Sequence, residues 1–262
     1  MNSLQIAATG MMAQELNVEV ISNNIANMRT TGFKRVRAEF QDLLYQDLRR
    51  VGSTSSDSGN TVPTGIQVGF GVKTGATSRV MSQGSLTNTE KELDVAIRGE
   101  GFFEITLPNG DTAFTRDGSF ELDSTGRLVT LDGYEVQPGI MIPQDARSIT
   151  INREGTVEVL TGTNTTPQQV GQLQLTRFVN KAGLQAIGDN LFLETPASGS
   201  PTQGSPGENG YGDIMQKFLE AANVNAVSEL SDLISAQRAY EMNARVISAS
   251  DEMMSATTNI LR

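Results

Sequence analysis

The last 44 residues, LEAANVNAVSELSDLISAQRAYEMNARVISASDEMMSATTNILR (Leu219–Arg262), are the most regular stretch of the chain. Apolar residues recur in it at strict seven-residue intervals, and this series consists of Leu219, Ala226, Leu233, Tyr240, Ile247, Met254 and Leu261. The stretch contains neither glycine nor proline. A seven-residue repeat sustained this far predicts a helix that supercoils against another helix. We therefore expect a C-terminal helix over 225–262 with an apolar seam.

The N-terminal segment has the same spacing. Its first apolar series consists of Leu4, Met11, Val18 and Ile25. A second series follows three positions later, at Ala7, Gln14, Ile21 and Met28. We expect Ser3 to cap this helix and Gly32 to end it. The basic residues near its end are expected to complement the helix dipole; they are Arg29, Lys34, Arg35 and Arg37.

Glycine and proline concentrate between these two ends. All eight prolines and 24 of the 26 glycines lie within 52–212, which favours short strands and turns there. Pro108-Asn-Gly-Asp111 predicts a hairpin, because Asn-Gly suits the positive φ angles of a type I′ turn. Such a pattern is typical of an antiparallel sandwich or barrel. The predicted fold class is α+β. The N- and C-terminal helices are expected to pair as a coiled coil, and the chain between them is expected to form a central antiparallel β-rich domain.

Shifts in composition suggest further boundaries. Gly52–Thr64 and Ala197–Gly212 are rich in Ser, Thr and Gly, and we expect them to be loops or linkers. The expected order is an N-terminal helical segment (1–44), an extension (45–65), a connecting β segment (66–95), a central β domain (96–195), a connecting linker (196–224) and the C-terminal helix (225–262).

The composition excludes most enzyme classes. The chain has no cysteine and no histidine, so no thiolate or imidazole chemistry is available. No catalytic, cofactor or metal site is expected. The net charge of −10 argues against nucleic-acid binding, and neither a transmembrane segment nor a cleaved signal is expected. One enzymatic alternative needs only carboxylates, a secreted carbohydrate-active β protein; its candidates are Asp94, Glu104, Asp117 and Asp123.

Two motifs near the chain ends resemble the signatures of bacterial flagellar rod and hook proteins. The first runs from ISNNIAN (21–27) to TGFK (31–34), and its matching residues are Asn23, Asn24, Ala26, Asn27, Thr31, Gly32, Phe33 and Lys34. The second comprises Asn223-Val-Asn225 and the run Gln237, Arg238, Ala239, Tyr240 and Glu241. Thr115-Arg-Asp-Gly118 resembles part of the β domain of that family.

The resemblance implies a structural subunit of a helical drive shaft and not an enzyme. Within the family, the length and the segment Tyr45–Thr64 resemble distal-rod subunits, with the proximal rod paralogue as the alternative. That segment is then expected to become ordered between subunits. The implied location is the basal-body rod in the periplasm. The implied partners are further copies of the chain, proximal rod proteins, the hook protein, the peptidoglycan and outer-membrane ring proteins and the flagellar type III export apparatus.

Overall fold

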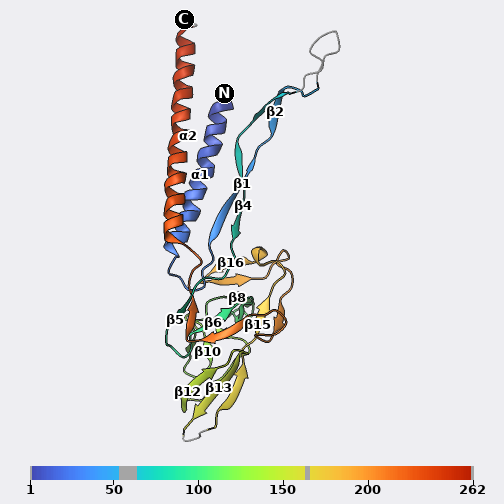
Figure 1. Ribbon diagram of the computed structural model, residues 1–262, viewed down its shortest axis with the longest axis vertical. Coiled ribbons are helices and arrows are strands. Elements are labelled where there is room, and N and C mark those ends of the chain that lie inside the picture. Colours follow the sequence, from blue (N-terminus) through green and yellow to red (C-terminus); the bar gives the residue numbers. More distant parts are fainter. Residues whose placement is uncertain (1, 53–63, 163–165, 261–262) are drawn as a thin grey trace. The chain divides into compact units, whose positions relative to one another are not determined.

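A computed structural model describes residues 2–52, 64–162 and 166–260 of the chain (Figure 1). The chain divides into two compact units. The first unit comprises Met1–Ile25, Val36–Ser78 and Asn225–Arg262. The second comprises Ala26–Arg35 and Arg79–Val224. In the sequence, the second unit therefore lies between the two terminal segments of the first unit. Residues 36–78, which belong to the first unit, divide it into two parts.

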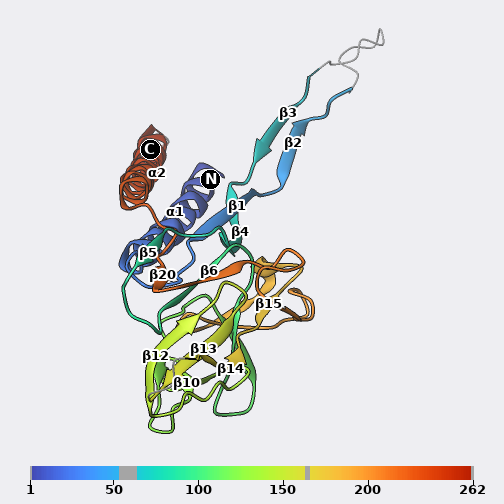
Figure 2. The ribbon, with the colours of Figure 1, turned by 60° about the horizontal axis from the view of Figure 1, so that its bottom comes forward.

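Two terminal helices belong to the first unit. They are α1 (Asn2–Ala26) and α2 (Ala226–Ile260), and they lie side by side in both views (Figures 1 and 2). The rest of the described chain is β-rich, so the coarser form of the predicted fold class, helical ends around a β-rich centre, is confirmed. No helix in the described part is long and apolar enough to cross a membrane.

The boundaries of α1 differ from those expected. Ser3 lies inside the helix, which begins at Asn2, so it is not the cap. The helix ends at Ala26 and not at Gly32, because the chain turns at once, with Thr30 N–H donating to the carbonyl of Asn27 at 3.1 Å. The last turn contains no basic residue, so the predicted dipole role of the basic cluster is wrong. Residues 1–44 are thus helical only in their first part.

A long β-ribbon completes the first unit. Strand β1 (Val36–Asp42) pairs with β4 (Val72–Arg79), and β2 (Tyr45–Arg49) pairs antiparallel with β3 (Ile66–Gly69). Two hydrogen bonds join these pairs, from Leu43 N–H to Gly71 O at 2.9 Å and from Phe70 N–H to Leu44 O at 3.1 Å. Part of the expected extension at 45–65 is therefore strand. Residues 53–63 lie outside the described part of the chain.

The second unit is built on antiparallel pairing. Its largest sheet has the strand order β16-β17-β8-β7-β11-β10-β9. These strands are β7 (Phe103–Thr106), β8 (Thr112–Thr115), β9 (Glu121–Leu122), β10 (Leu128–Val129), β11 (Glu135–Val136), β16 (Gln185–Gly188) and β17 (Leu191–Leu193). A short helix, η1 (Lys181–Gly183), precedes β16.

Smaller sheets surround this one. A three-stranded sheet consists of β12 (Ala146–Ile151), β13 (Thr156–Thr161) and β14 (Gln168–Gln172). The pairs are β15 (Leu175–Arg177) with β18 (Thr202–Gly204), β6 (Val95–Arg98) with β19 (Asp213–Gln216), and β5 (Leu86–Asn88) with β20 (Phe218–Glu220). Residues 196–224, expected to be a linker, thus contain three strands.

The predicted hairpin is present but its turn type differs. Strands β7 and β8 flank residues 107–111, and Gly110 N–H donates to Leu107 O at 2.9 Å. Gly110 has φ of +88°, whereas Asn109 is not among the residues with positive φ. A type I′ turn needs positive φ at both central residues, and proline fixes φ near −65°. Pro108 at the first central position of this four-residue turn therefore excludes type I′.

The core of the second unit is rich in phenylalanine. Phe103 and Phe120 are both fully buried and pack edge to face with their ring centroids 5.1 Å apart. A second group surrounds Phe114, which packs edge to face against Phe178 at 4.7 Å. Aromatic pairs in this arrangement contribute stability beyond the area they bury. This core supports the strands that carry the polar contacts described below.

Replacing Phe103 by alanine is expected to lower the free energy of unfolding by about 3–5 kcal/mol, because the cavity left beside Phe120 cannot collapse fully. Urea unfolding of the purified chain measures this change. The matched control is Val179→Ala, since the Val179 side chain is 93% exposed and surface changes usually stay within about 0.5 kcal/mol. Equal losses in the two variants would contradict the assignment of the core.

Candidate assembly site

Asn24 joins three segments of the first unit. Its side-chain oxygen accepts a hydrogen bond from Val36 N–H at 2.9 Å, and its amide nitrogen donates to Val36 O at 2.8 Å. The same nitrogen donates to Glu229 Oε2 at 3.2 Å. Asn24 and Glu229 are both buried. One asparagine of the N-terminal motif therefore holds the first residue of β1 and the first turn of α2 beside the end of α1.

The start of α2 is set by Asn225, from the C-terminal motif. Its side-chain oxygen accepts hydrogen bonds from Val227 N–H at 3.0 Å and Ser228 N–H at 3.3 Å, the geometry of an N-cap. Glu229 lies in the first turn that follows. A carboxylate is favourable there because the helix dipole places partial positive charge at the N-terminus. The sequence thus starts α2 at a defined residue.

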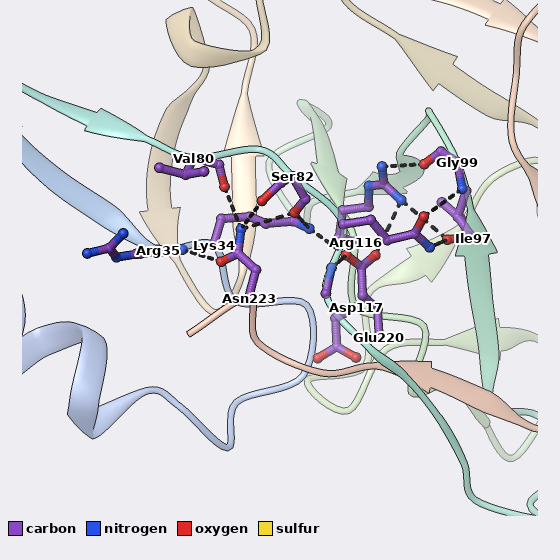
Figure 3. A network of polar contacts seen from close by, with 12 residues as sticks. Lys34, Arg35, Val80, Ser82, Ile97, Gly99, Arg116, Asp117, Glu220 and Asn223 are labelled. Atoms are coloured by element: carbon purple, nitrogen blue, oxygen red, sulfur yellow. Dashed lines mark hydrogen bonds and ion pairs between the residues drawn. The ribbon is translucent and has the colours of Figure 1, made fainter. Parts of the chain in front are cut away.

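A buried cluster of charges lies in the second unit (Figure 3). Lys34 Nζ donates to Glu220 Oε1 at 2.5 Å, and Arg116 Nη1 donates to Glu220 Oε2 at 3.3 Å. Gly84 N–H also donates to Oε1, at 2.9 Å. Lys34, Arg116 and Glu220 are only 1–3% exposed. These three residues are called the buried triad below; one carboxylate in it is shared by two cations.

Each cation of the buried triad also contacts backbone. Lys34 Nζ donates to Ser82 O at 2.9 Å, and Arg116 Nη2 donates to Gly99 O at 2.7 Å. The Arg116 guanidinium lies 5.4 Å from the ring centre of Phe102, within the range of a cation–π contact. The triad therefore links the segment after α1 to the strands of the second unit.

Burial and charge act against each other in the triad. Desolvation by burial lowers the pKa of Lys34 and of Arg116, and the charge of Glu220 opposes that lowering in both. A buried cation without a partner is costly, and removing one partner of a buried ion pair is strongly destabilising. Glu220 is thus the residue whose loss would leave two buried cations unpaired.

Asn223 ties three further segments of the second unit together. Its amide nitrogen donates to Val80 O at 2.7 Å and to Ser82 O at 3.0 Å, and its oxygen accepts from Arg35 N–H at 2.7 Å. Val80 N–H in turn donates to Arg35 O at 2.8 Å. Figure 3 shows Asn223 between these backbone groups. The second motif thus contributes to packing on the same side of the unit as Lys34.

The predicted apolar seam is only partly covered. Leu4, Met11, Val18 and Ile25 are half-buried on α1. On α2, Ala226, Leu233 and Ile247 are half-buried, whereas Tyr240 and Met254 are exposed. Leu219 belongs to β20 and not to the helix, because the helix starts only after the Asn225 cap. Leu261 lies outside the described residues.

The helix residues with the deepest burial are of a different kind. They are Ala7, Ala13, Ile21, Asn24, Glu229, Ala236 and Ser250. Most of them are small or polar, which a search for apolar repeats does not detect. For the same reason, the apolar pattern of the sequence does not indicate that Glu229, or Glu220 in the second unit, is buried. The one signal available was the seven-residue spacing of Glu229, Ala236, Asn243 and Ser250.

The remaining motif residues divide between turn and surface positions. In the N-terminal motif, Thr30 Oγ1 donates to Asn27 Oδ1 at 3.1 Å, Thr31 O accepts from Asn190 Nδ2 at 3.0 Å, and Phe33 is buried. Asn23 and Ala26 are exposed. In the C-terminal motif Ala239 is half-buried, and the exposed residues are Gln237, Arg238, Tyr240 and Glu241.

Gly32 needs the conformation that glycine permits. Its φ is +69°, and a Cβ built on it would lie 2.8 Å from the backbone nitrogen of Asp117. Its N–H donates to Glu220 O at 2.7 Å. The motif glycine therefore lets its backbone lie close to the backbone at Asp117 within the second unit.

The candidate carboxylates of the enzymatic alternative serve turns and packing. Asp117 accepts from Ser119 N–H at 3.0 Å, and Asp123 accepts from Thr125 N–H at 2.7 Å. Hydrogen bonding from Thr125 lowers the pKa of Asp123. Asp94 and Glu104 are likewise held in the sheets, through the Asp94–Ser119 bridge and the Thr176 hydroxyl. These roles are those that aspartate commonly has in turns.

Comparison with known proteins addresses the function. Residues 4–34 match the flagella basal body rod protein family, residues 96–159 the flagellar hook protein FlgE/F/G D1 domain, and residues 215–260 the flagellar basal body rod FlgEFG protein C-terminal family. The chain is 58% identical to flagellar basal-body rod protein FlgG of Caulobacter vibrioides over 99% of both chains. It is 50% identical to that of Agrobacterium fabrum over the full length of both. The chain belongs to the flagellar basal-body rod protein family.

It follows that the chain is a structural subunit of the flagellar distal rod and not an enzyme, and that its location is the rod of the basal body. The carbohydrate-active alternative is thereby dropped. Each of the three matched segments supplies one residue of the buried triad: Lys34, Arg116 and Glu220, in chain order. The triad therefore joins the three parts that characterise the family.

Replacing Glu220 by alanine is expected to destabilise the purified chain by about 3–5 kcal/mol, because two buried cations lose their shared partner. The control is Glu121→Ala, since Glu121 pairs with Lys91 at the surface, where an ion pair contributes about 0–1 kcal/mol. Urea unfolding at pH 7 compares the two variants. A Glu220 variant as stable as the Glu121 variant would show that the triad does not support the fold.

Proposed function

We propose that copies of this chain polymerise into a straight helical drive shaft that transmits torque from motor to hook. The observation that carries the proposal is full-length similarity to rod proteins combined with unusual apolar exposure in the first unit. Large apolar side chains are exposed along α2, and they include Val227, Leu230, Ile234, Met242 and Met253. Exposed apolar surface of this extent marks an interaction site.

The terminal helices supply the inner part of the shaft in this proposal, paired as an antiparallel coiled coil. Two hydrogen bonds support the pairing, Asn24 with Glu229 and Ser3 with Ser250. Asn243 also lies close to Gly10. The half-buried seam residues, among them Leu233 and Ile247, then bind helices of neighbouring copies. Each Val-, Leu- or Ile-sized side chain that becomes buried stabilises the assembly by about 1.5–3 kcal/mol.

The β-ribbon supplies a second contact between copies. Its exposed apolar residues are Phe40, Leu44, Tyr45, Leu48, Val51 and Ile66. An isolated two-stranded ribbon is marginally stable at best in water, and Leu44 is 83% exposed. Burial of these side chains against a neighbouring copy would fix the ribbon in the assembly and stiffen the shaft.

The proposal also includes partners other than copies of the chain. A flagellar hook protein of Helicobacter mustelae is 44% identical to this chain over 138 residues, which are 52% of the chain and 30% of that protein. The shared part supports direct succession of rod and hook subunits in one lattice. We extend the proposal to proximal rod proteins, to the peptidoglycan and outer-membrane ring proteins that surround the rod, and to the flagellar type III export apparatus.

Electron microscopy of basal bodies from cells lacking the chain tests the function. Rods that end short and carry no hook are expected. Complementation with the full chain should restore rod and hook, whereas a version lacking Tyr45–Thr64 should not restore a straight distal rod. Complete rods and hooks in the absence of the chain would overturn the proposal.

The seam has its own test. Leu233→Asp or Ile247→Asp should block polymerisation, because every subunit contact would bury an unpaired charge. Circular dichroism of the purified variants should show the β signal of the full chain unchanged. Ser248→Asp, at an exposed position beside Ile247, is the control and should still assemble. Assembled rods containing either seam variant would contradict the role given to these residues.

A further inference from the structure

The contacts between the two terminal helices obey one simple rule. The contacting pairs are 24 and 229, 10 and 243, and 3 and 250, and in each pair the residue numbers add to 253. Two helices keep such a constant sum only when they run antiparallel in one register. On each helix, the residues of successive pairs are seven or 14 positions apart. Seven residues are the repeat of a supercoiled pair of helices.

We infer that this register is set by a line of small and polar residues, with the buried Asn24–Glu229 pair as its lock. The inference rests on the proposed pairing of the helices and names the residues that position it. On α1 the line consists of Ser3, Gly10, Asn17 and Asn24, and on α2 of Glu229, Ala236, Asn243 and Ser250.

The middle of the line permits close approach of the helices. A Cβ built on Gly10 would lie 2.9 Å from Asn243 Nδ2, so the Asn243 side chain would have to move to admit it. Ala236, which the same register places opposite Asn17, is buried. Small residues at these two positions thus leave room for the facing side chains along the line.

The end of the line carries the specificity. Apolar heptads can slide past each other by seven residues at little cost, because each position is replaced by a similar one. A buried polar group resists such sliding, as a single asparagine does in other coiled coils. Asn24 is moreover fixed to β1 by its two hydrogen bonds with Val36. If α2 shifted by seven residues along α1, so that the paired numbers added to 260, Asn24 would face Ala236 and would lose its hydrogen bond to Glu229.

The register also determines how far α2 extends beyond α1. Helix α1 begins at Asn2, which the register pairs with Asp251, so no residue from Glu252 onward has a partner number on α1. Residues 252–260 of α2, about 14 Å of helix, therefore project past the pair. The exposed Met253 and Met254 lie in this part. Locking the register thus sets the length of helix that each subunit offers to other copies.

Disulfide cross-linking tests the register, because the chain has no cysteine of its own. The pair Asn17→Cys and Ala236→Cys joins two positions that the register places opposite. The matched pair Asn17→Cys and Asn243→Cys reports a slip by seven residues. Both are expressed as full chains in cells, and purified basal bodies are oxidised and separated without reductant. An intramolecular product migrates as a monomer and an intermolecular one as a dimer.

The 17–236 pair should give the intramolecular product, and the 17–243 pair should not. Adding Glu229→Leu should shift the balance toward the 17–243 product by about five- to 150-fold, the equivalent of the 1–3 kcal/mol cost of an unsatisfied buried polar group. Glu229→Gln retains an oxygen that accepts from Asn24 and should keep the 17–236 product. If Glu229→Leu only destabilised the chain, the yields of the 17–236 and 17–243 disulfides would both fall and their ratio would stay the same.

The remaining outcomes separate this inference from the proposed function. An intramolecular 17–243 product in the unaltered background would overturn the register while preserving the pairing. Only dimers from the 17–236 pair would mean that the helices pair between copies, which would overturn the pairing itself. Unchanged disulfide products in the Glu229→Leu background would show that the Asn24–Glu229 pair does not set the register. The absence of any disulfide from both cysteine pairs would overturn the register and the pairing together.

Discussion

A buried negative charge is the interaction on which the second unit depends. Glu220 accepts hydrogen bonds from Lys34 and Arg116 and brings together three distant parts of the chain. Neither cation is stable in the interior without that carboxylate, and the carboxylate is equally costly without the cations. The arrangement therefore forms only when all three segments are in place. This mutual dependence explains why each segment matched by the rod families contributes one member of the triad.

Motif residues gather where the chain passes between the two units, after residues 25, 35, 78 and 224. In the first unit, Asn24 binds the first residue of β1 and the first turn of α2. In the second unit, Asn223 binds Arg35 and Val80. Amides suit these positions because each presents donors and an acceptor to backbone groups at once. The motif residues Asn24 and Asn223 thus each hold backbone segments together within their own unit.

The helices divide their surfaces by chemistry. The most deeply buried helix residues are mostly small or polar, with Ile21 as an apolar exception, whereas Leu230 and Ile234 remain exposed. In the proposed assembly, such a subunit pairs its own helices in one register and offers the exposed apolar residues to other copies. Small residues give close approach and polar pairs give a unique alignment. Apolar burial, which has no direction, then supplies the energy of assembly.

Several features were predictable from local pattern. The two helices and the hairpin at 107–111 follow from apolar spacing and from turn residues, which act over a few positions. Their details were not predictable in the same way. Pro108 overrode the turn type that Asn-Gly favours, and the Asn225 cap excluded Leu219 from a repeat that it fits by spacing. The linker expected at 196–224 pairs as strands because its partners are β5, β6 and β15, far away in the sequence.

The sequence by its own pattern determined the helical ends, the β-rich centre, the lack of thiol and imidazole chemistry and the likeness to rod and hook proteins. Each of these depends on composition or on spacing within a short window. Only the tertiary structure decided that Glu220 and Glu229 are buried, that Lys34 and Arg116 share Glu220, and which residues of the helices face each other. Buried polar groups find partners far along the chain, 205 residues apart for Asn24 and Glu229. A charged residue looks alike in the sequence whether water or a buried partner satisfies it.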